Sequence, residues 1–134
     1  MRNFSVVMLA LLLAACAVPP AATATGLITR QQAVAAAVER ASMSAPEVSG
    51  ALIAPTNVQA SQITLGEALL RMGENANPPG GYSRELPVWY VTMDGLWEGE
   101  MTAPGVTVTP ARYRHCIVVL DAVTGMEIQG ALRP

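Results

Sequence analysis

YRHCIVVLDA, residues 113–122, is the most strongly strand-forming stretch of the chain. Its central residues 117–120 are continuously apolar, a pattern typical of a central strand that is buried on both faces. The carboxylate of Asp121 precedes backbone amides that can donate to it, and Gly125 can adopt positive φ, so a turn should follow. Apolar residues return on alternate positions after that turn, at Met126, Ile128 and Leu132. The two runs predict a C-terminal β-hairpin.

A second strand is predicted upstream, over residues 87–93, where β-branched and aromatic residues alternate with few polar ones. Trp89 lies in the middle of this run, so we expect it in the core rather than on a binding surface. The pair Asp94-Gly95 predicts a tight turn that leads to Leu96 and Trp97. Prolines and glycine within residues 98–111 then predict a loop around a short extended piece at 106–108.

The N-terminal part of the domain begins with a helix signal. Thr29 and Gln32 have the spacing of a capping box, in which the hydroxyl and the amide satisfy backbone groups at a helix start. Residues 42–46 end the helix, because Pro46 disfavours helical conformation just before it. The apolar residues at helical spacing form a narrow stripe of small side chains, suited to close packing on a sheet: Ala33, Val34, Ala37, Val38 and Ala41.

Between helix and strand the signals are shorter. Residues 48–53 and 58–65 are β-compatible and are separated by Pro55, Thr56 and Asn57, which together predict a turn. Thr64 and Glu67 repeat the capping-box spacing, so one strand should run into a short second helix that stops at the glycine of position 73. Residues 74–85 are rich in asparagine, proline and glycine and predict an exposed loop.

Composition limits the functional classes. Of 134 residues, 51% are hydrophobic and 13% are charged, which suits one compact domain with an export segment and excludes disorder over most of the length. All basic residues are arginines, they are dispersed, and the formal net charge is −2. No basic patch marks a nucleic-acid footprint, so we expect no nucleic-acid partner.

The N-terminus has the pattern of an export and anchoring signal. Arg2 gives a short positive start, residues 4–13 form an apolar run, and Leu13-Ala14-Ala15-Cys16 closes it as a lipobox. The run is shorter than the roughly 20 apolar residues that a membrane-spanning helix needs. We therefore predict a signal peptide over residues 1–15, cleavage after Ala15, and lipid attachment through the sulfur of Cys16.

The order of segments follows from this anchor. Residues 16–26 form a tether, because Pro19-Pro20 and an Ala/Thr run have little that can pack, and residues 27–134 form the domain. A lipid on Cys16 would remove it from disulfide formation, which leaves Cys116 as a lone thiol in a strand. A small buried hydrophobic role is favoured there over a reactive or metal-binding one.

An opening helix, a strand with Val88-Trp89-Tyr90-Val91 and Gly95, and a strand that ends in residues 121–125 (DAVTG) together resemble the PepSY and PepSY-like domains of bacterial secreted and membrane proteins. The resemblance covers about residues 27–132. It implies a cystatin-like α+β fold, with one main N-terminal helix packed on a curled antiparallel sheet, beside which we expect the short second helix. It also implies a role in restraining peptidases or in binding at the cell envelope, and it carries over no catalytic residue. The chain departs from the family at Met126, where a glutamate is common, and in the long loop 98–111.

Few residues suggest catalysis. His115 is the single histidine, and Cys116 beside it points to the opposite face of a strand, so a zinc site is not expected. A Ser/His/Asp set using Asp121 lacks a nucleophile elbow. Glu98 and Glu100 near Trp97 resemble a glycosidase pair, but carboxylates two residues apart in a loop have no fixed separation and are usually solvated. No cofactor-binding or metal-binding motif is present in the sequence.

Three functional hypotheses follow. The favoured one is a lipid-anchored extracytoplasmic module that binds or inhibits a protein or peptide and is not itself an enzyme. It would lie on the outer face of the cell membrane, or on the outer membrane of a two-membrane cell, since Ala17 gives no retention signal of the aspartate type. The alternatives are a small surface hydrolase that uses Glu98, Glu100 or His115, and a passive structural protein of the envelope.

Overall fold

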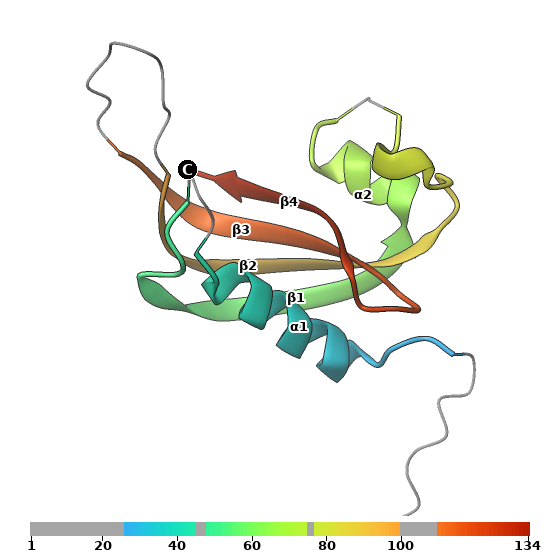
Figure 1. Cartoon of the computed structure of the whole chain (residues 1–134), viewed down its shortest axis with the longest axis horizontal. Coiled ribbons are helices and arrows are strands. Elements are labelled where there is room, and N and C mark those ends of the chain that lie inside the picture. Colours follow the sequence, from blue (N-terminus) through green and yellow to red (C-terminus); the bar gives the residue numbers. More distant parts are fainter. Residues whose placement is uncertain (1–25, 45–47, 75–76, 100–109) are drawn as a thin grey trace, which may run out of the picture.

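The computed structural model describes residues 26–44, 48–74, 77–99 and 110–134 (Figure 1). Residues 1–25, which include the predicted signal peptide, Cys16 and nearly all of the tether, lie outside the described residues, as do 45–47, 75–76 and 100–109. The described elements follow one another along the chain as α1 (Arg30–Ser42), β1 (Ile53–Thr64), α2 (Leu65–Arg71), the 3₁₀ turn η1 (Pro79–Gly81), β2 (Pro87–Gly99), β3 (Ala111–Asp121) and β4 (Glu127–Arg133).

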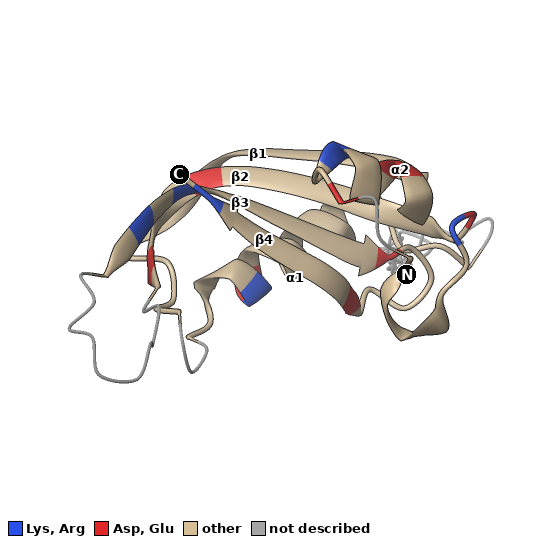
Figure 2. Cartoon of the chain, turned by 90° about the horizontal axis from the view of Figure 1, so that it is seen from above, with Lys and Arg blue, Asp and Glu red and all other residues tan. Residues whose placement is uncertain are grey.

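The four strands form one antiparallel sheet in the order β1-β2-β3-β4, so the predicted α+β class with a curled sheet, a main helix and a short second helix is confirmed. The two helices lie on opposite faces of this sheet (Figures 1 and 2). Because β2 and β3 are central, their side chains are buried alternately against one helix and then the other. Figure 2 shows that charged residues gather towards the ends of strands and helices, whereas the middle of the sheet is largely free of them.

Helix α1 begins as the sequence predicts. The Thr29 hydroxyl accepts from the Gln32 amide at 3.2 Å, and the Gln32 side chain accepts from the Thr29 amide at 2.8 Å, which completes the capping box. Ala33, Ala37 and Ala41 are the buried stripe, and their small side chains let the helix approach the sheet closely. The helix ends at Ser42, within the predicted terminating segment.

Two tryptophans of β2 hold α1 at both ends. The indole Nε1 of Trp89 donates to the carbonyl of Ile28, just before the helix, at 3.2 Å. The indole Nε1 of Trp97 donates to the carbonyl of Ala41, in the last turn, at 2.8 Å. Both rings are buried in the same apolar cluster as the alanine stripe, so the prediction of a core role for Trp89 is confirmed.

Two predicted turns are wrong, because the chain continues through both as strand. β2 runs past Asp94-Gly95 with a register shift before Trp97, and a side chain on Gly95 would come within 2.6 Å of the Trp97 ring. The glycine at position 95 therefore makes room for an indole rather than for a tight turn. β1 likewise runs through Pro55 to Asn57, where two register shifts and a positive φ of 49° at Asn57 replace the predicted turn with bulges.

The predictions for the second helix and for the C-terminal hairpin hold. β1 leads directly into α2, where the Thr64 hydroxyl accepts from the Glu67 amide at 3.3 Å, and the glycine after the helix, Gly73, has φ of 77°. The Asp121 carboxylate accepts from the amides of Val123 and Thr124 at 2.7 and 3.0 Å, which fixes the predicted β3–β4 hairpin. The strand over residues 48–53 is reduced to a single bridge between Val48 and Gly99 before β1 begins.

Candidate functional site

A groove opens where helix α1 ends. Helix α1 packs mainly on β1, β2 and β3 and contacts the edge strand β4 less, chiefly through the ion pair of Arg40 with Glu127. Between the last turn of the helix and β4 lies a groove of about 480 Å³, a size that accommodates a side chain or a small ligand. Most of its apolar lining comes from Ala41, Met43, Val48, Trp97, Cys116, Val118 and Leu132.

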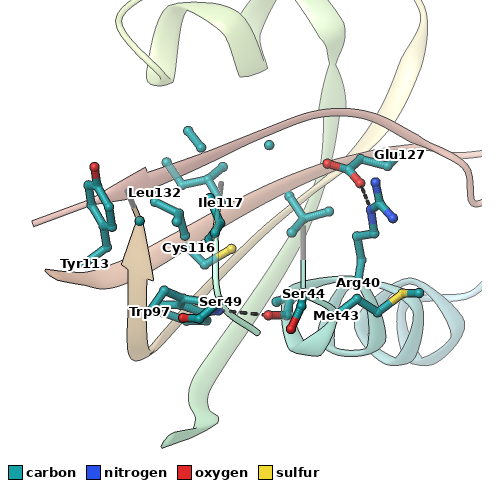
Figure 3. A pocket seen from close by; sticks show the side chains of 16 residues that line it. Arg40, Met43, Ser44, Ser49, Trp97, Tyr113, Cys116, Ile117, Glu127 and Leu132 are labelled. Carbon is teal, nitrogen blue, oxygen red and sulfur yellow. Dashed lines mark hydrogen bonds and ion pairs between the residues drawn. The ribbon is translucent and has the colours of Figure 1, made fainter. Parts of the chain in front are cut away.

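Its lining combines fixed and adaptable side chains (Figure 3). Trp97 is fully buried and is held by its hydrogen bond to Ala41, so this wall is rigid. Met43, by contrast, is 56% exposed at the mouth, and its unbranched thioether can adapt to the shape of a ligand. A rigid aromatic wall with a flexible thioether at its mouth suits apolar side chains of varied shape.

An ion pair lies beside the groove. Arg40 of α1 donates through Nε to the Glu127 carboxylate of β4 and links the helix to the strand (Figure 3). Gly130 provides the space for this carboxylate, because a Cβ at that position would lie 2.8 Å from Oε1 of Glu127. The pair neutralises both charges beside an apolar surface, while the guanidinium of Arg40 remains largely exposed.

Cys116 contributes its thiol to the groove lining. It is a free, buried cysteine, as the sequence predicts. Burial, reinforced by the nearby negative charge of Glu127, raises the pKa of this thiol to about 11. At neutral pH the group is therefore a protonated, apolar lining atom and a poor nucleophile.

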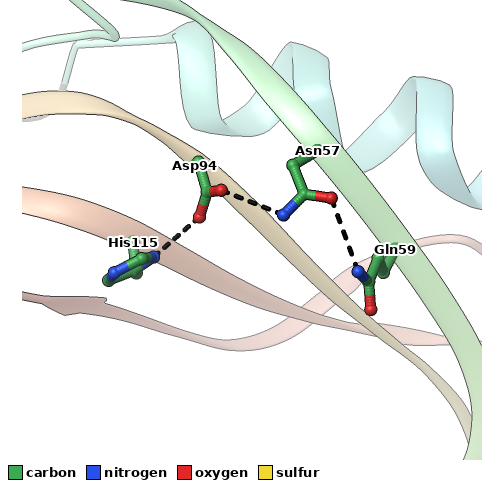
Figure 4. A network of polar contacts seen from close by, with 4 residues as sticks. All are labelled: Asn57, Gln59, Asp94 and His115. Atoms are coloured by element: carbon green, nitrogen blue, oxygen red, sulfur yellow. Dashed lines mark hydrogen bonds and ion pairs between the residues drawn. The ribbon is translucent and has the colours of Figure 1, made fainter.

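A polar network crosses the sheet outside the groove (Figure 4). Nδ1 of His115 on β3 lies 2.7 Å from Oδ1 of Asp94 on β2, and the Asn57 amide donates to Oδ2 of Asp94 at 3.0 Å. The hydrogen bond from Asn57, followed by that from His115, holds the pKa of Asp94 below its usual value. Gln59 extends the network to Asn57 at 3.4 Å. All four side chains are solvent-accessible, so the network fixes the bulged end of the sheet without enclosing a reaction site.

The residues suggested for catalysis are not brought together. Glu98 accepts from Arg112 at 3.1 Å, and His115 bonds to Asp94; neither Glu98 nor His115 lines the groove. Glu100 lies outside the described residues. His115 is exposed on the sheet, and Asp94 is the one side-chain hydrogen-bond partner recorded for it in the described part of the chain.

Sequence patterns did not reveal the groove. Its lining comes from α1, the segment before β1, and strands β2, β3 and β4, and its ion pair joins residues 87 positions apart. The available signals were indirect: an arginine in the last turn of a short helix, and a glycine within β4. Without knowledge of the strand order, the sequence does not show that this arginine and this glycine lie near each other.

The described part of the chain offers neither a metal site nor a membrane-spanning helix. Residues 26–44, 48–74, 77–99 and 110–134 contain no group of three or more metal-ligating side chains, and none of their helices is long and apolar enough to cross a membrane. No family model, curated protein or solved structure matches the chain.

Proposed function

We propose that this chain is a lipid-anchored, extracytoplasmic binding module that takes an extended segment of a partner protein along β4 and inserts one of its apolar side chains into the groove. The observation that carries the proposal is the preformed groove of about 480 Å³ beside the edge strand β4. The proposal includes no catalysis by the chain itself.

The main-chain part of the interaction comes from β4. This strand pairs with β3 alone among the described strands, so its outer edge presents backbone donors and acceptors to an added strand. Strand addition draws affinity from main-chain hydrogen bonds and specificity from pockets for alternate side chains. The groove lies on the α1 side of β4, where every second side chain of an added strand would point.

The position of the candidate catalytic groups favours binding over hydrolysis. A general acid or base has to lie within about 3 Å of its target in a plausible complex. Glu98 and His115 instead have their own partners outside the groove, and Cys116 is held as a neutral thiol. The runner-up function, a small hydrolase, would have to use a site other than this groove.

The cellular setting rests on the sequence. The lipobox places a lipid on Cys16 and cleavage after Ala15, and the resemblance to PepSY-like domains suggests a role in restraining peptidases at the cell envelope. An extended peptide in the groove agrees with either restraint of a peptidase or capture of an envelope protein. The fold has the helix and curled sheet that this resemblance implies.

The binding proposal is tested by a matched pair of surface substitutions. The chain without residues 1–15 and with Cys16→Ser is screened against a library of random linear peptides, and selected peptides are titrated by calorimetry. Met43→Lys, at the groove mouth, should weaken binding at least about tenfold, or about 1.4 kcal/mol. Leu70→Lys is the control, since its side chain is equally exposed, 58% against 56%, but lies on α2 outside the groove.

Three outcomes would contradict the proposal. Absence of any selected peptide would favour the passive structural role, and equal weakening by both lysine variants would place the binding surface elsewhere. Assays on peptide, ester and glycoside substrates complete the test. Turnover that is lost in Glu98→Ala, Glu100→Ala or His115→Ala would establish the hydrolase instead.

The anchor is tested separately. Palmitate labelling of expressing bacteria should mark the wild-type chain and not Cys16→Ser, because a hydroxyl is a much weaker nucleophile than a thiolate toward the lipid donor. Equal labelling of the two chains would refute the assignment of Cys16.

A further inference from the structure

The tip of the β3–β4 hairpin exposes apolar side chains. Val123 is 52% exposed and Met126 is 68% exposed, the largest exposure recorded for a large hydrophobic residue in the described part of the chain. The turn does not need them for its geometry, because the Asp121 carboxylate holds the turn amides and Gly125 supplies the positive φ of 72°. The turn geometry therefore leaves two exposed apolar side chains available for a contact outside the domain.

The same tip adjoins the point where the chain enters the domain. The amide of Ile28 donates to the carbonyl of Ala122 at 2.8 Å, and a Cβ on Gly125 would be 3.4 Å from Cδ1 of Ile28. The chain that leads back to Cys16 therefore meets the domain beside Val123 and Met126. Figure 1 shows the hairpin turn and the start of α1 at the same end of the molecule.

The distance to the anchor is short. Residues 17–25 separate Cys16 from the first described residue, and a fully extended chain spans at most about 3.3–3.6 Å per residue, so the domain end stays within about 35 Å of the lipid. A tether this short keeps the hairpin tip at high effective concentration near the bilayer. Two apolar side chains that would bind weakly from solution can then occupy the membrane interface for much of the time.

We propose that the hairpin tip, Val123 and Met126 beside Ile28, rests in the lipid interface of the membrane that carries the anchor. This inference builds on the lipid anchor of the proposed function. It also sets an orientation, because the groove lies at the other end of α1. A helix of 13 residues is about 20 Å long, so the part of the groove formed by the last turn of α1 lies about 20 Å from the start of the helix, while its Glu127 side is next to Met126.

The test places an environment-sensitive fluorophore on Met126→Cys or on a matched control, Leu52→Cys. Leu52 is 54% exposed and lies beside the start of β1, at the opposite end of the sheet (Figure 1). Cys116 stays in place, since its buried thiol with raised pKa reacts slowly with the label at neutral pH. The lipidated chain is reconstituted into vesicles of phosphatidylethanolamine and phosphatidylglycerol, with and without a lipid that carries a quencher in its acyl chain.

The label at position 126 should shift to shorter wavelength on vesicles and be quenched several-fold more strongly than the label at position 52. Equal quenching at the two positions, or none at either, would overturn the inference. A second arm uses Cys16→Ser with an N-terminal histidine tag on vesicles that contain a nickel-chelating lipid. This arm tests the hairpin contact even if Cys16 carries no lipid, so failure of the anchor and failure of the contact are distinguished.

Discussion

Removal of one indole N–H should reveal how strongly the sheet holds the end of helix α1. Trp97→Phe keeps an aromatic ring in the core but removes the donor that satisfies the carbonyl of Ala41 at 2.8 Å. That carbonyl belongs to the last turn of the helix, where carbonyls lack intrahelical partners. Because the hydrogen bond is buried, water cannot readily replace the indole N–H.

The cost has two parts. A buried carbonyl left without a partner costs about 1–3 kcal/mol, and the smaller ring leaves a cavity that adds roughly 1 kcal/mol. The expected loss in free energy of unfolding is therefore about 2–4 kcal/mol. For a domain of this size each kilocalorie lowers Tm by about 4–8 °C, so Tm should fall by about 10 °C or more.

Trp89→Phe is the matched comparison. Its bond to the carbonyl of Ile28 is longer, 3.2 Å, and is only partly buried, so water can hydrate the freed carbonyl. We expect a loss of about 1–2 kcal/mol for this variant. Urea unfolding followed by circular dichroism measures both, and an unchanged m value shows that the unfolding transition stays comparable. A loss below about 1 kcal/mol for Trp97→Phe, or a larger loss for Trp89→Phe, would refute the argument.

Three further predictions concern single residues. Gly125→Val should lower the free energy of unfolding by about 1 kcal/mol or more, since Gly125 has φ of 72°; an unchanged Tm would contradict this. Hydrogen bonds lower the pKa of Asp94 in the folded chain, so its contribution to stability is present above the ordinary pKa of an aspartate and is lost as the pH falls through the lowered value. The Tm difference between wild type and Asp94→Asn should thus be greatest near neutral pH and vanish in strong acid, and a difference independent of pH would argue against the network. Because Cys116 is buried and its thiol has a pKa of about 11, it should react with iodoacetamide at pH 8 many times more slowly in the folded chain than in urea. Mass spectrometry measures both rates, and equal rates would show that the thiol is accessible.

Local signals predicted the elements whose stabilising contacts are themselves local. The capping box of Thr29 and Gln32 and the Asp121 turn each join residues at most three positions apart, so the sequence contains the whole contact. The prediction of a turn at Asp94-Gly95 was wrong because the same dipeptide also fits a bulged strand. The ring of Trp97 over Gly95, which the sequence does not reveal, decides between the two.

The groove required knowledge of topology. Its ion pair joins Arg40 to Glu127, and the space it occupies depends on Gly130 lying beneath the carboxylate. None of these residues has an unusual local pattern. They share a site because the last turn of α1 lies near the edge strand β4 in the fold.

The two edges of the sheet differ in a way that limits self-association. A sheet with two regular free edges can add copies of itself indefinitely, each copy offering its second edge to the next. Here the first half of the β1 edge carries Pro55, two register shifts and the positive φ of Asn57, and so presents an irregular row of backbone groups, whereas residues 59–64 are regularly paired. β4, in contrast, is regularly paired with β3 from Gln129 to Arg133. A sheet whose two edges differ in this way is less suited to the repeated edge-to-edge addition that builds a filament than a sheet with two regular edges.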